Sequence, residues 1–238
     1  MLAKIKNYIY TTLQRFWNSF LPDETMTDSK KKWNRLAKEN ARYFVMTDYG
    51  EKINEETFRN SGKNDFQMLI EKDDLLQKKL VPFKDKKVLE IGCGIGRITE
   101  FLANNFGEVT GIDISEQMIE HGKKRLANKN NVRLAATDGL TFPFPDSNFD
   151  LVFSFIVFQH MPDIATIRRN LEEIGRVLKP NGLAKIQLRG LPTSKKNWFY
   201  GPAFARRDAE KLIASLPLAI IKTEGENQRY FWLWLEKH

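Results

Sequence analysis

The sequence predicts an α/β protein with a doubly wound, mostly parallel sheet, and two observations support this fold class. From residue 87 onward, apolar segments of strand length alternate with segments whose apolar residues recur every three or four positions, as in helices. Such alternation is typical of a parallel sheet with helices on both faces. The last segment, 218–237, holds two strand patterns around a Gly-Glu-Asn turn without a helix, so it must be an antiparallel hairpin at the sheet edge.

The elements expected after residue 87 follow in a regular order. Five strands precede the terminal hairpin, at 87–91, 108–114, 131–138, within 149–158 and at 183–190. The segment 149–158 is expected to begin as a strand and to run into a loop. Four helices are expected, at 96–107, 115–129, 163–182 and 204–216. Gly107 ends the first of these helices, and Pro180 and Gly182 stop the third, because both residue types disfavour continuation of a helix.

The N-terminal third reads as a series of helices. Residues 2–21 repeat apolar side chains on one helix face. The next helix begins at a cap formed by Thr27 or Asp28, and residues 51–80 continue as further helices before a linker. We therefore expect an N-terminal helical lid segment over 1–80 and an α/β domain over 81–238.

Composition and charge bound the class of protein. Hydrophobic residues make up 42% of the 238 residues, enough for a sizeable core, which excludes disorder over the whole length. Cys93 is the only cysteine, so no intrachain disulfide can form, and this favours the cytoplasm. No run of 18 apolar residues and no secretory signal occur. The net charge of +8 permits phosphate-rich or membrane-surface partners without identifying one.

Three glycines at alternate positions separate the first strand from its helix. In VLEIGCGIGRITE, Glu90 ends the strand pattern, and Gly92, Gly94 and Gly96 follow. A strand, a glycine loop and a helix N-terminus form a nucleotide-binding corner, because glycine lets a ligand approach the main chain. The dinucleotide fingerprint G-x-G-x-x-G is not met, since the third glycine comes one residue early. A ligand without a pyrophosphate suits this loop better.

Acidic residues end the next two strands. Asp113 closes the second strand, where a carboxylate can accept both hydroxyls of a ribose. Asp138 ends the third strand, where an acid can accept a hydrogen bond from an exocyclic amine such as that of adenine. Ribose, adenine and no phosphate together point to an adenosine thioether or sulfonium.

These motifs resemble those of class I S-adenosylmethionine-dependent methyltransferases. The matching segments are EIGCGIG, GIDIS, TDG, FDLVFSFIVFQHMPD and LKPNG, in the family's order. The resemblance covers residues 86–238 and implies S-adenosyl-L-methionine as cofactor, with S-adenosyl-L-homocysteine as its product. It also implies a Rossmann-like, seven-stranded sheet of order 3-2-1-4-5-7-6 with strand 7 antiparallel, which explains the terminal hairpin.

The resemblance implies which residues bind the cofactor. The expected cofactor site comprises Glu90, Gly92, Cys93, Gly94, Gly96, Asp113, Ile114, Met118, Asp138, Gly139 and Phe155. The glycine loop would pass the methionine moiety, and Glu90 would orient that loop. Asp113 would hold the ribose, Ile114 and Met118 would flank the adenine, and Asp138 and Gly139 would contact its polar edge. Phe155 would begin the loop that faces the transferable methyl.

His160 is the candidate catalytic residue. It follows the fourth strand in FQHMPD, where a histidine could act as a general base, although a structural or pocket-wall role is the interpretation that we favour. Arg97 either contacts a ligand carboxylate or is a surface arginine. Three scattered histidines and one cysteine give no zinc-type cluster, so no metal site is expected.

The sequence narrows the acceptor without naming it. The loop after the fourth strand lacks the Asn/Asp-Pro-Pro-aromatic motif of enzymes that methylate amino groups of DNA bases. We therefore expect O- or N-methylation of a small-molecule, sugar or lipid-linked acceptor. RNA methylation or RNA binding, and a catalytically silent cofactor-binding regulator, remain the alternatives. The oligomeric state stays open.

The first helix has two interpretations. Its apolar face either covers the cofactor and acceptor cleft as a lid, or lies on an anionic membrane as a peripheral anchor. The second interpretation rests on Lys4, Lys6 and Arg15, which meet no acidic residue before Asp23. We favour the lid, because the helices that follow leave no long flexible linker.

Overall fold

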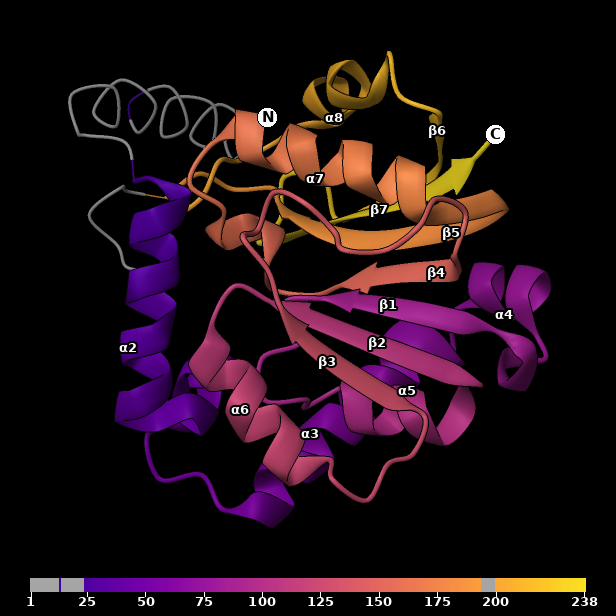
Figure 1. The fold of residues 1–238 in the computed structure, drawn as a ribbon. Coiled ribbons are helices and arrows are strands. Elements are labelled where there is room, and N and C mark those ends of the chain that lie inside the picture. Colours follow the sequence, from indigo (N-terminus) through magenta and orange to yellow (C-terminus); the bar gives the residue numbers. More distant parts are fainter. Residues whose placement is uncertain (1–12, 14–23, 194–199) are drawn as a thin grey trace.

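The structure is a computed structural model that describes residues 13, 24–193 and 200–238 (Figure 1). In this part of the chain, seven strands form one sheet in the order β3-β2-β1-β4-β5-β7-β6, which confirms the predicted order. The strands are β1 (Lys87–Ile91), β2 (Glu108–Asp113), β3 (Val132–Ala136), β4 (Phe149–Ser154), β5 (Leu178–Arg189), β6 (Leu218–Glu224) and β7 (Tyr230–Lys237). Strand β7 runs antiparallel to both β5 and β6, so the predicted edge hairpin is confirmed.

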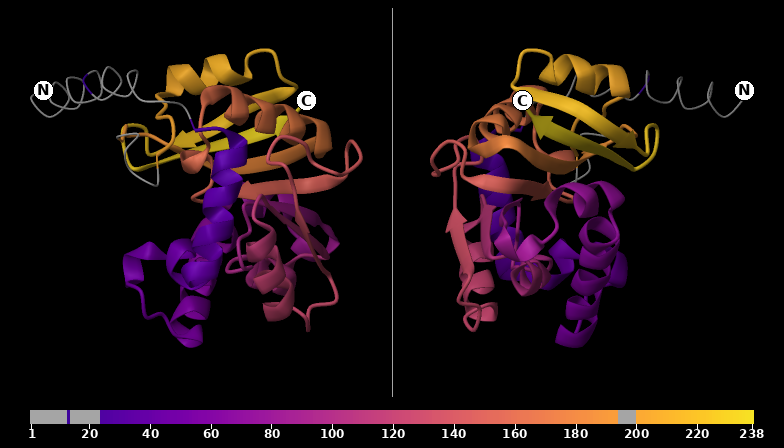
Figure 2. Two further views of the ribbon diagram at one scale, coloured as in Figure 1. Left: turned by 60° about the vertical axis from the view of Figure 1, so that its left-hand side comes forward. Right: turned by 90° about the vertical axis from the view of Figure 1, so that its right-hand side faces the viewer.

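Helices cover both faces of this sheet (Figure 2). The described helices are α2 (Met26–Val45), α3 (Glu55–Phe66), α4 (Asp74–Leu80), α5 (Thr99–Asn105), α6 (Glu116–Arg125), α7 (Ile164–Val177) and α8 (Arg206–Ile213). Side chains alternate between the faces of a strand, and the two cores follow this alternation. Phe231 and Leu233 of β7 pack in the core that α7 and α8 cover, whereas Trp232 and Trp234 pack in the core that α4 and α5 cover.

Several element ends differ from the sequence prediction. The predicted helix over 163–182 ends at Val177, and β5 begins at Leu178 rather than at residue 183, so Pro180 and Gly182 lie within the strand and do not stop the helix. Strand β4 ends at Ser154, and the predicted continuation into a loop over the rest of 149–158 begins there, since Ile156 adopts a positive φ of 59° that no strand accommodates.

Helix α2 is capped by Thr25, so the predicted caps Thr27 and Asp28 are wrong. The Thr25 hydroxyl accepts a hydrogen bond from the Asp28 N–H at 3.1 Å, and the Asp28 carboxylate accepts one from the Thr25 N–H. Asp28 is therefore the third helical residue of a capping box.

The segment before β1 shares the core of the sheet. Asp73 caps α4 and also accepts hydrogen bonds from Lys185 Nζ of β5 at 2.7 Å and from Trp234 Nε1 of β7 at 2.8 Å. Both Asp73 and Lys185 are buried, so removal of one partner would leave a buried charge without compensation. Helix α4 is thus fastened to the sheet, and the boundary at residues 80 and 81 stays a prediction.

The predicted helix over 2–21 lies outside the described residues, apart from Leu13. Both interpretations of that helix, lid and membrane anchor, therefore stay predictions. Within the described ranges, no helix is both long enough and apolar enough to cross a membrane.

Candidate functional site

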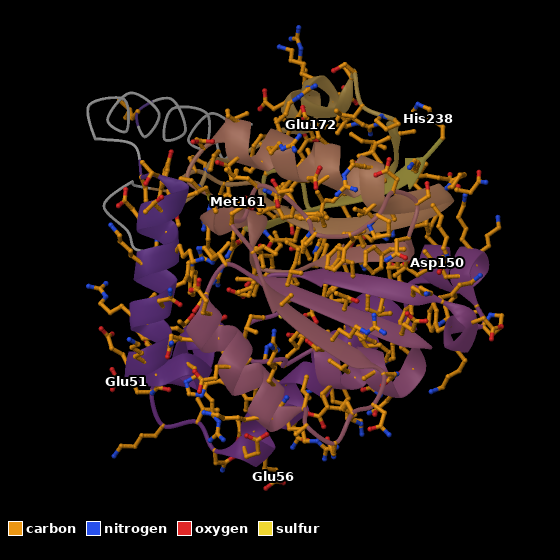
Figure 3. The ribbon with its side chains drawn as sticks, viewed as in Figure 1. Glu51, Glu56, Asp150, Met161, Glu172 and His238 are labelled. Carbon is orange, nitrogen blue, oxygen red and sulfur yellow. The ribbon has the colours of Figure 1, made fainter. Side chains whose placement is uncertain are left out.

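A cleft lies at the carboxyl-terminal edge of the sheet, with about 1060 Å³ of free space that includes solvent outside its mouth. Its floor is the loop between β1 and α5, together with the end of β2. Its walls are the β4–α7 connection and helix α2, which stands beside this edge in Figure 1. Met161, labelled in Figure 3, is one of the wall residues of the β4–α7 connection. Ligands of open α/β sheets bind at this edge, outside the carboxyl ends of the strands.

The glycine loop can adopt its course only with glycine at two lining positions. Gly92 and Gly94 have positive φ angles of 71° and 54°. A Cβ atom on Gly92 would lie 2.1 Å from Val157 Cγ2, and one on Gly94 would lie 3.1 Å from Val45 Cγ2. The loop therefore passes directly beneath the β4–α7 connection and α2. Gly96 does not line the cleft and instead packs against Leu126.

Asp113 ends β2 and faces the cleft with its carboxylate held by the backbone. Its Oδ2 accepts from the Gly94 N–H at 2.9 Å and its Oδ1 accepts from the Ser115 N–H at 2.9 Å. Burial raises the pKa of Asp113 to about 6, although the hydrogen bonds from Ser115, Gly94 and Ile114 oppose this rise. Each carboxylate oxygen keeps acceptor capacity for a further donor, such as a hydroxyl of a ligand.

Glu90, on β1, is a second buried acid in the cleft. Thr99 Oγ1 donates a hydrogen bond of 2.6 Å to Glu90 Oε2. Burial raises the pKa of Glu90 from an ordinary value near 4.5 to about 7, against the hydrogen bond from Thr99 and the charge of Arg97, while Asp113 adds to the rise. The ionised carboxylate therefore lacks full compensation in the protein alone, and a cationic ligand group would stabilise it.

We expect Glu90→Gln to remove a pH dependence of stability. Because the pKa of Glu90 is raised to about 7 in the folded state, its contribution is fully present below pH 4.5 and is lost as the pH rises through 7. A shift of this size corresponds to about 3 kcal/mol of unfolding free energy. In urea unfolding from pH 4.5 to 8, wild type should lose stability relative to the variant. Equal pH profiles would contradict the assignment, and Glu56→Gln, at an exposed position labelled in Figure 3, is the control.

Arg97, just after the glycine loop, is buried rather than a surface residue. Its Nη1 donates hydrogen bonds to Asp65 Oδ2 at 2.5 Å and to Ser61 Oγ at 3.3 Å. Its Nε is buried with no hydrogen-bond partner among the described residues. Because Arg97 also lines the cleft, this Nε–H is a donor that a ligand carboxylate could satisfy.

Cys93 lines the cleft, and its buried thiol is poorly suited to act as a nucleophile. Burial raises the pKa of its thiol well above the ordinary range, and the carboxylates of Asp113 and Glu90 raise it further. Since only the thiolate attacks, Cys93 acts as a small packing residue in the loop.

The end of β3 differs from the arrangement that the sequence predicts. Asp138 is exposed and is not among the residues that line the cleft, because its Oδ1 accepts hydrogen bonds from the Leu140 and Thr141 N–H groups at 2.8 and 2.7 Å. Thr137 and Gly139 form the cleft wall at this point. The other predicted adenosine-side residues, Ile114 and Met118, do line the cleft.

Helix α2 closes the cleft over the end of β2. Met26, Ser29, Trp33, Phe44 and Val45 of this helix line it. Asn34 fixes the helix in place, because its Oδ1 accepts a hydrogen bond from Ser115 Oγ at 2.8 Å and its Nδ2 donates one to Glu116 Oε2 at 2.8 Å. Ser115 in turn bonds Asp113, so the lid helix and the acidic residue of β2 share one hydrogen-bonded corner.

The β4–α7 connection brings His160 to the opposite wall. Its ring packs edge-on against Trp33, with centroids 5.6 Å apart. Gln187 Nε2 donates to Gln159 Oε1 at 3.2 Å, which leaves the Gln159 amide nitrogen, 3.2 Å from His160 Nε2, as the donor of that pair. His160 Nε2 is therefore an acceptor, and in a neutral imidazole the other nitrogen then carries the proton. The lone pair that a general base would use is already engaged.

Sequence reasoning missed several lining residues. Trp33 and Phe44 are not among them, because the sequence shows them as N-terminal aromatic residues that could wall an apolar or sugar acceptor, although a core role was the simpler interpretation for most of these residues. Asn170 of α7 donates a hydrogen bond of 2.7 Å to the Gly139 carbonyl and so fixes the β3 loop, and nothing in the local sequence indicates this contact. The apolar run SFIVF at the end of β4 is the sequence feature that could have indicated that Val157 lines the cleft.

Comparison with known proteins defines the class. Residues 88–182 match the family model described as a methyltransferase domain. Together with the strand order and the glycine loop, this match supports a class I S-adenosylmethionine-dependent methyltransferase. The demethylmenaquinone methyltransferase of Staphylococcus aureus strain MRSA252 is 39% identical over 113 residues, which cover 46% of this chain and 46% of that protein. The chain thus spans about half the length of the curated relatives it matches.

Solved structures share the fold at low sequence identity. A SAM-dependent methyltransferase from Aquifex aeolicus has a TM-score of 0.56 at 18% identity, covering 79% of this chain and 100% of that one. A geranyl diphosphate C-methyltransferase from Streptomyces coelicolor A3(2), in complex with Mg²⁺, geranyl diphosphate and S-adenosyl-L-homocysteine, has a TM-score of 0.63 at 15% identity. That match covers 90% of this chain and 97% of the other.

Proposed function

We propose that the protein transfers a methyl group from S-adenosyl-L-methionine to a small-molecule acceptor. The observation that carries this proposal is the joint placement of Glu90, the Gly92–Gly94 turn and Asp113 in one cleft beneath α2. When bound, the cofactor supplies a methyl group on a positive sulfonium that is already activated for displacement.

The residues of the cleft fit the chemical groups of this cofactor. Asp113 accepts hydrogen bonds from the ribose hydroxyls, and Ile114 and Met118 flank the adenine. The buried carboxylate of Glu90 is compensated by the ammonium of the methionine moiety, directly or through water. The unsatisfied Nε–H of Arg97 donates to its carboxylate. Asp138 keeps a predicted contact with the adenine amine only if its exposed carboxylate turns toward the cleft.

The protein's part in the reaction is alignment and exclusion of water. Phe155 and Val157 line the cleft beside the glycine loop, where the acceptor would bind, and α2 covers the cleft. Holding two reactants in line removes much of the entropic barrier, and a dry cleft strengthens the electrostatic interactions inside it. No dedicated base is needed for an acceptor that is already ionised or is a neutral amine.

We expect His160→Ala to lose only about tenfold in turnover, whereas removal of a true general base costs about 10²–10⁴-fold. The reason is the Gln159 amide, which already occupies the Nε2 lone pair. pH–rate profiles of wild type, His160→Ala and His160→Gln would test this once an acceptor is known. A thousandfold loss, together with a vanished ionisation near neutral pH, would assign His160 as the base.

The acceptor is a small molecule, a sugar or a lipid-linked intermediate, methylated on oxygen or nitrogen. The curated relative named above, a demethylmenaquinone methyltransferase, supports a small-molecule acceptor. Arg97 is the only lysine or arginine among the described residues that line the cleft, which disfavours an RNA acceptor with its many phosphates. The cytoplasmic location and any membrane contact stay predictions.

An acceptor screen by labelled-methyl transfer tests the proposal. The full chain, S-adenosyl-L-methionine with a labelled methyl and a fractionated metabolite extract should give a labelled small product. Labelling of RNA would favour the alternative acceptor. Binding of the cofactor without any transfer in complete extracts would favour the silent regulator.

A further inference from the structure

Gln187 of β5 lies behind the β4–α7 wall of the cleft and is not among the residues that line it. Its side chain is fully buried, and both ends of its amide bond the backbone. Its Oε1 accepts a hydrogen bond of 3.0 Å from the Ile156 N–H, and its Nε2 donates one to the Leu188 carbonyl. Because a backbone N–H can only donate and a carbonyl can only accept, these two contacts fix the orientation of the Gln187 amide.

The bond from Ile156 replaces a strand partner that this residue lacks. Strand β4 ends at Ser154, and Ile156 has a φ of 59°, a left-handed conformation that β-branched residues rarely adopt. A residue keeps such a conformation only when its surroundings hold it there. Gln187 supplies this hold at the start of the connection that brings Ile156, Val157 and His160 to the cleft.

The fixed amide of Gln187 also sets the orientation of Gln159. Gln187 Nε2 donates to Gln159 Oε1 at 3.2 Å, so the Gln159 amide nitrogen faces His160 Nε2, also at 3.2 Å. Gln159 is buried, and a Cβ atom on Gly201 would lie 2.0 Å from its carbonyl oxygen, so the turn has no room to move outward. Backbone groups at Ile156 and Leu188 therefore determine, through two glutamines, that His160 Nε2 accepts a hydrogen bond.

We propose that Gln187 is a positioning residue that holds the β4–α7 wall of the cleft and fixes, through Gln159, the neutral form of His160 with its proton on Nδ1. His160 lines the cleft, whereas Gln187 and Gln159 do not, so a contact behind the wall determines the chemistry of a group in it. The inference rests on the proposed function only for its ligand, S-adenosyl-L-homocysteine. The proton position on His160 can be measured without any ligand.

Nuclear magnetic resonance of the full chain with isotope-labelled histidine nitrogens tests the proton position. The chain has three histidines, and His160→Gln assigns the signals of His160 by their disappearance. At about pH 8, where an ordinary imidazole is neutral, we expect the wild-type His160 proton on Nδ1. His121 and His238 are exposed, so they exchange between both neutral forms and serve as internal references.

Two substitutions test how the proton is fixed. The carboxylate of Gln159→Glu has no N–H, so the His160 and Gln187 nitrogens beside it must both donate, and His160 Nε2 should now carry a proton. Gln187→Met keeps the size of the side chain but removes its donor and acceptor, so the His160 signals should shift toward the mixture of the references. Gln228→Met, at an exposed position, is the control and should change neither.

Hydrogen exchange of the Ile156 amide measures the hold on the wall. Gln187→Met should speed this exchange at least about tenfold, because the acceptor of the Ile156 N–H is gone. The Gly94 amide, which donates to Asp113 at 2.9 Å in the glycine loop, should keep its protection in the same variant. A loss of protection at Ile156 alone therefore distinguishes the positioning role from a general loss of stability.

Calorimetric titration with S-adenosyl-L-homocysteine separates this inference from the proposed function. Gln187→Met should weaken binding about threefold to tenfold, because Val157 of the wall packs against Gly92 of the glycine loop. Unchanged affinity, or unchanged His160 signals in the folded variant, would overturn the inference, as would a wild-type His160 proton on Nε2. Absence of binding by wild type with the His160 proton on Nδ1 would overturn the proposed function alone.

Discussion

Asp113→Ala should lower the affinity for S-adenosyl-L-methionine and S-adenosyl-L-homocysteine by about 1.5–3 kcal/mol, or tenfold to over a hundredfold. The lost interactions are the charge-assisted hydrogen bonds to the two ribose hydroxyls. The same carboxylate also orders the glycine loop, because it accepts the Gly94 N–H at 2.9 Å. Loss of the ribose hydrogen bonds and loss of order in the glycine loop should both weaken cofactor binding. Isothermal titration calorimetry of the folded variant measures the loss.

A matched substitution separates the two effects. Asp113→Asn keeps the shape of the side chain and one acceptor oxygen but removes the charge, so its affinity should lie between those of wild type and Asp113→Ala. Circular dichroism verifies that each variant is folded. An unchanged affinity in folded Asp113→Ala would contradict the proposal that Asp113 binds the ribose hydroxyls.

Gly92→Ala should lower the free energy of unfolding and abolish cofactor binding. The φ angle of 71° costs an alanine about 1–2 kcal/mol, and the new Cβ would lie 2.1 Å from Val157 Cγ2 and 2.9 Å from Val157 Cβ. The β4–α7 connection must therefore move away from the glycine loop. Urea unfolding and calorimetric titration with S-adenosyl-L-homocysteine check both consequences.

Gly50→Ala is the control for the backbone term. Gly50 has a similar φ of 79°, but nothing lies within 4 Å of its added Cβ. Because Gly50 also has a ψ of 177°, a combination almost confined to glycine, its alanine variant carries the full backbone cost, and a larger loss in Gly92→Ala reports the close approach of Val157. Val157→Ala should recover part of the loss when combined with Gly92→Ala, because the contact with Cγ2 disappears. Equal losses in Gly92→Ala and Gly50→Ala would contradict the close packing of the loop.

The sequence predicted the fold and the site best where a local strand or helix pattern ends at residues that the proposed cofactor site uses. Strand and helix periods alternate from residue 87 onward, and Gly92 and Asp113 sit at strand ends where the sheet must bind its ligand. Asp138 closes the third strand as Asp113 closes the second in the sequence prediction, but β3 ends at Ala136, so Asp138 lies in the loop beyond it and bonds its own loop. The sequence contains no signal that distinguishes an aspartate that bonds its own backbone from one that bonds a ligand.

The lid was harder to predict because its contacts are distant in the chain. Asn34 and Ser115 are 81 positions apart, and their hydrogen bond joins two helices whose patterns are each complete without it. The aromatic residues of α2 fit a core as well as a cleft wall, so periodicity alone could not assign them. In the described residues, α2 covers the cleft and lies within the helical lid segment predicted over 1–80, whereas the helix predicted at 2–21 lies outside them.

Calorimetric titration of the full chain with S-adenosyl-L-homocysteine, in a buffer containing a metal chelator, tests the central claim most directly. The account predicts saturable binding at one site per chain, competed by S-adenosyl-L-methionine and not by NAD. Absence of binding, or tighter binding of NAD at the same site, would contradict it.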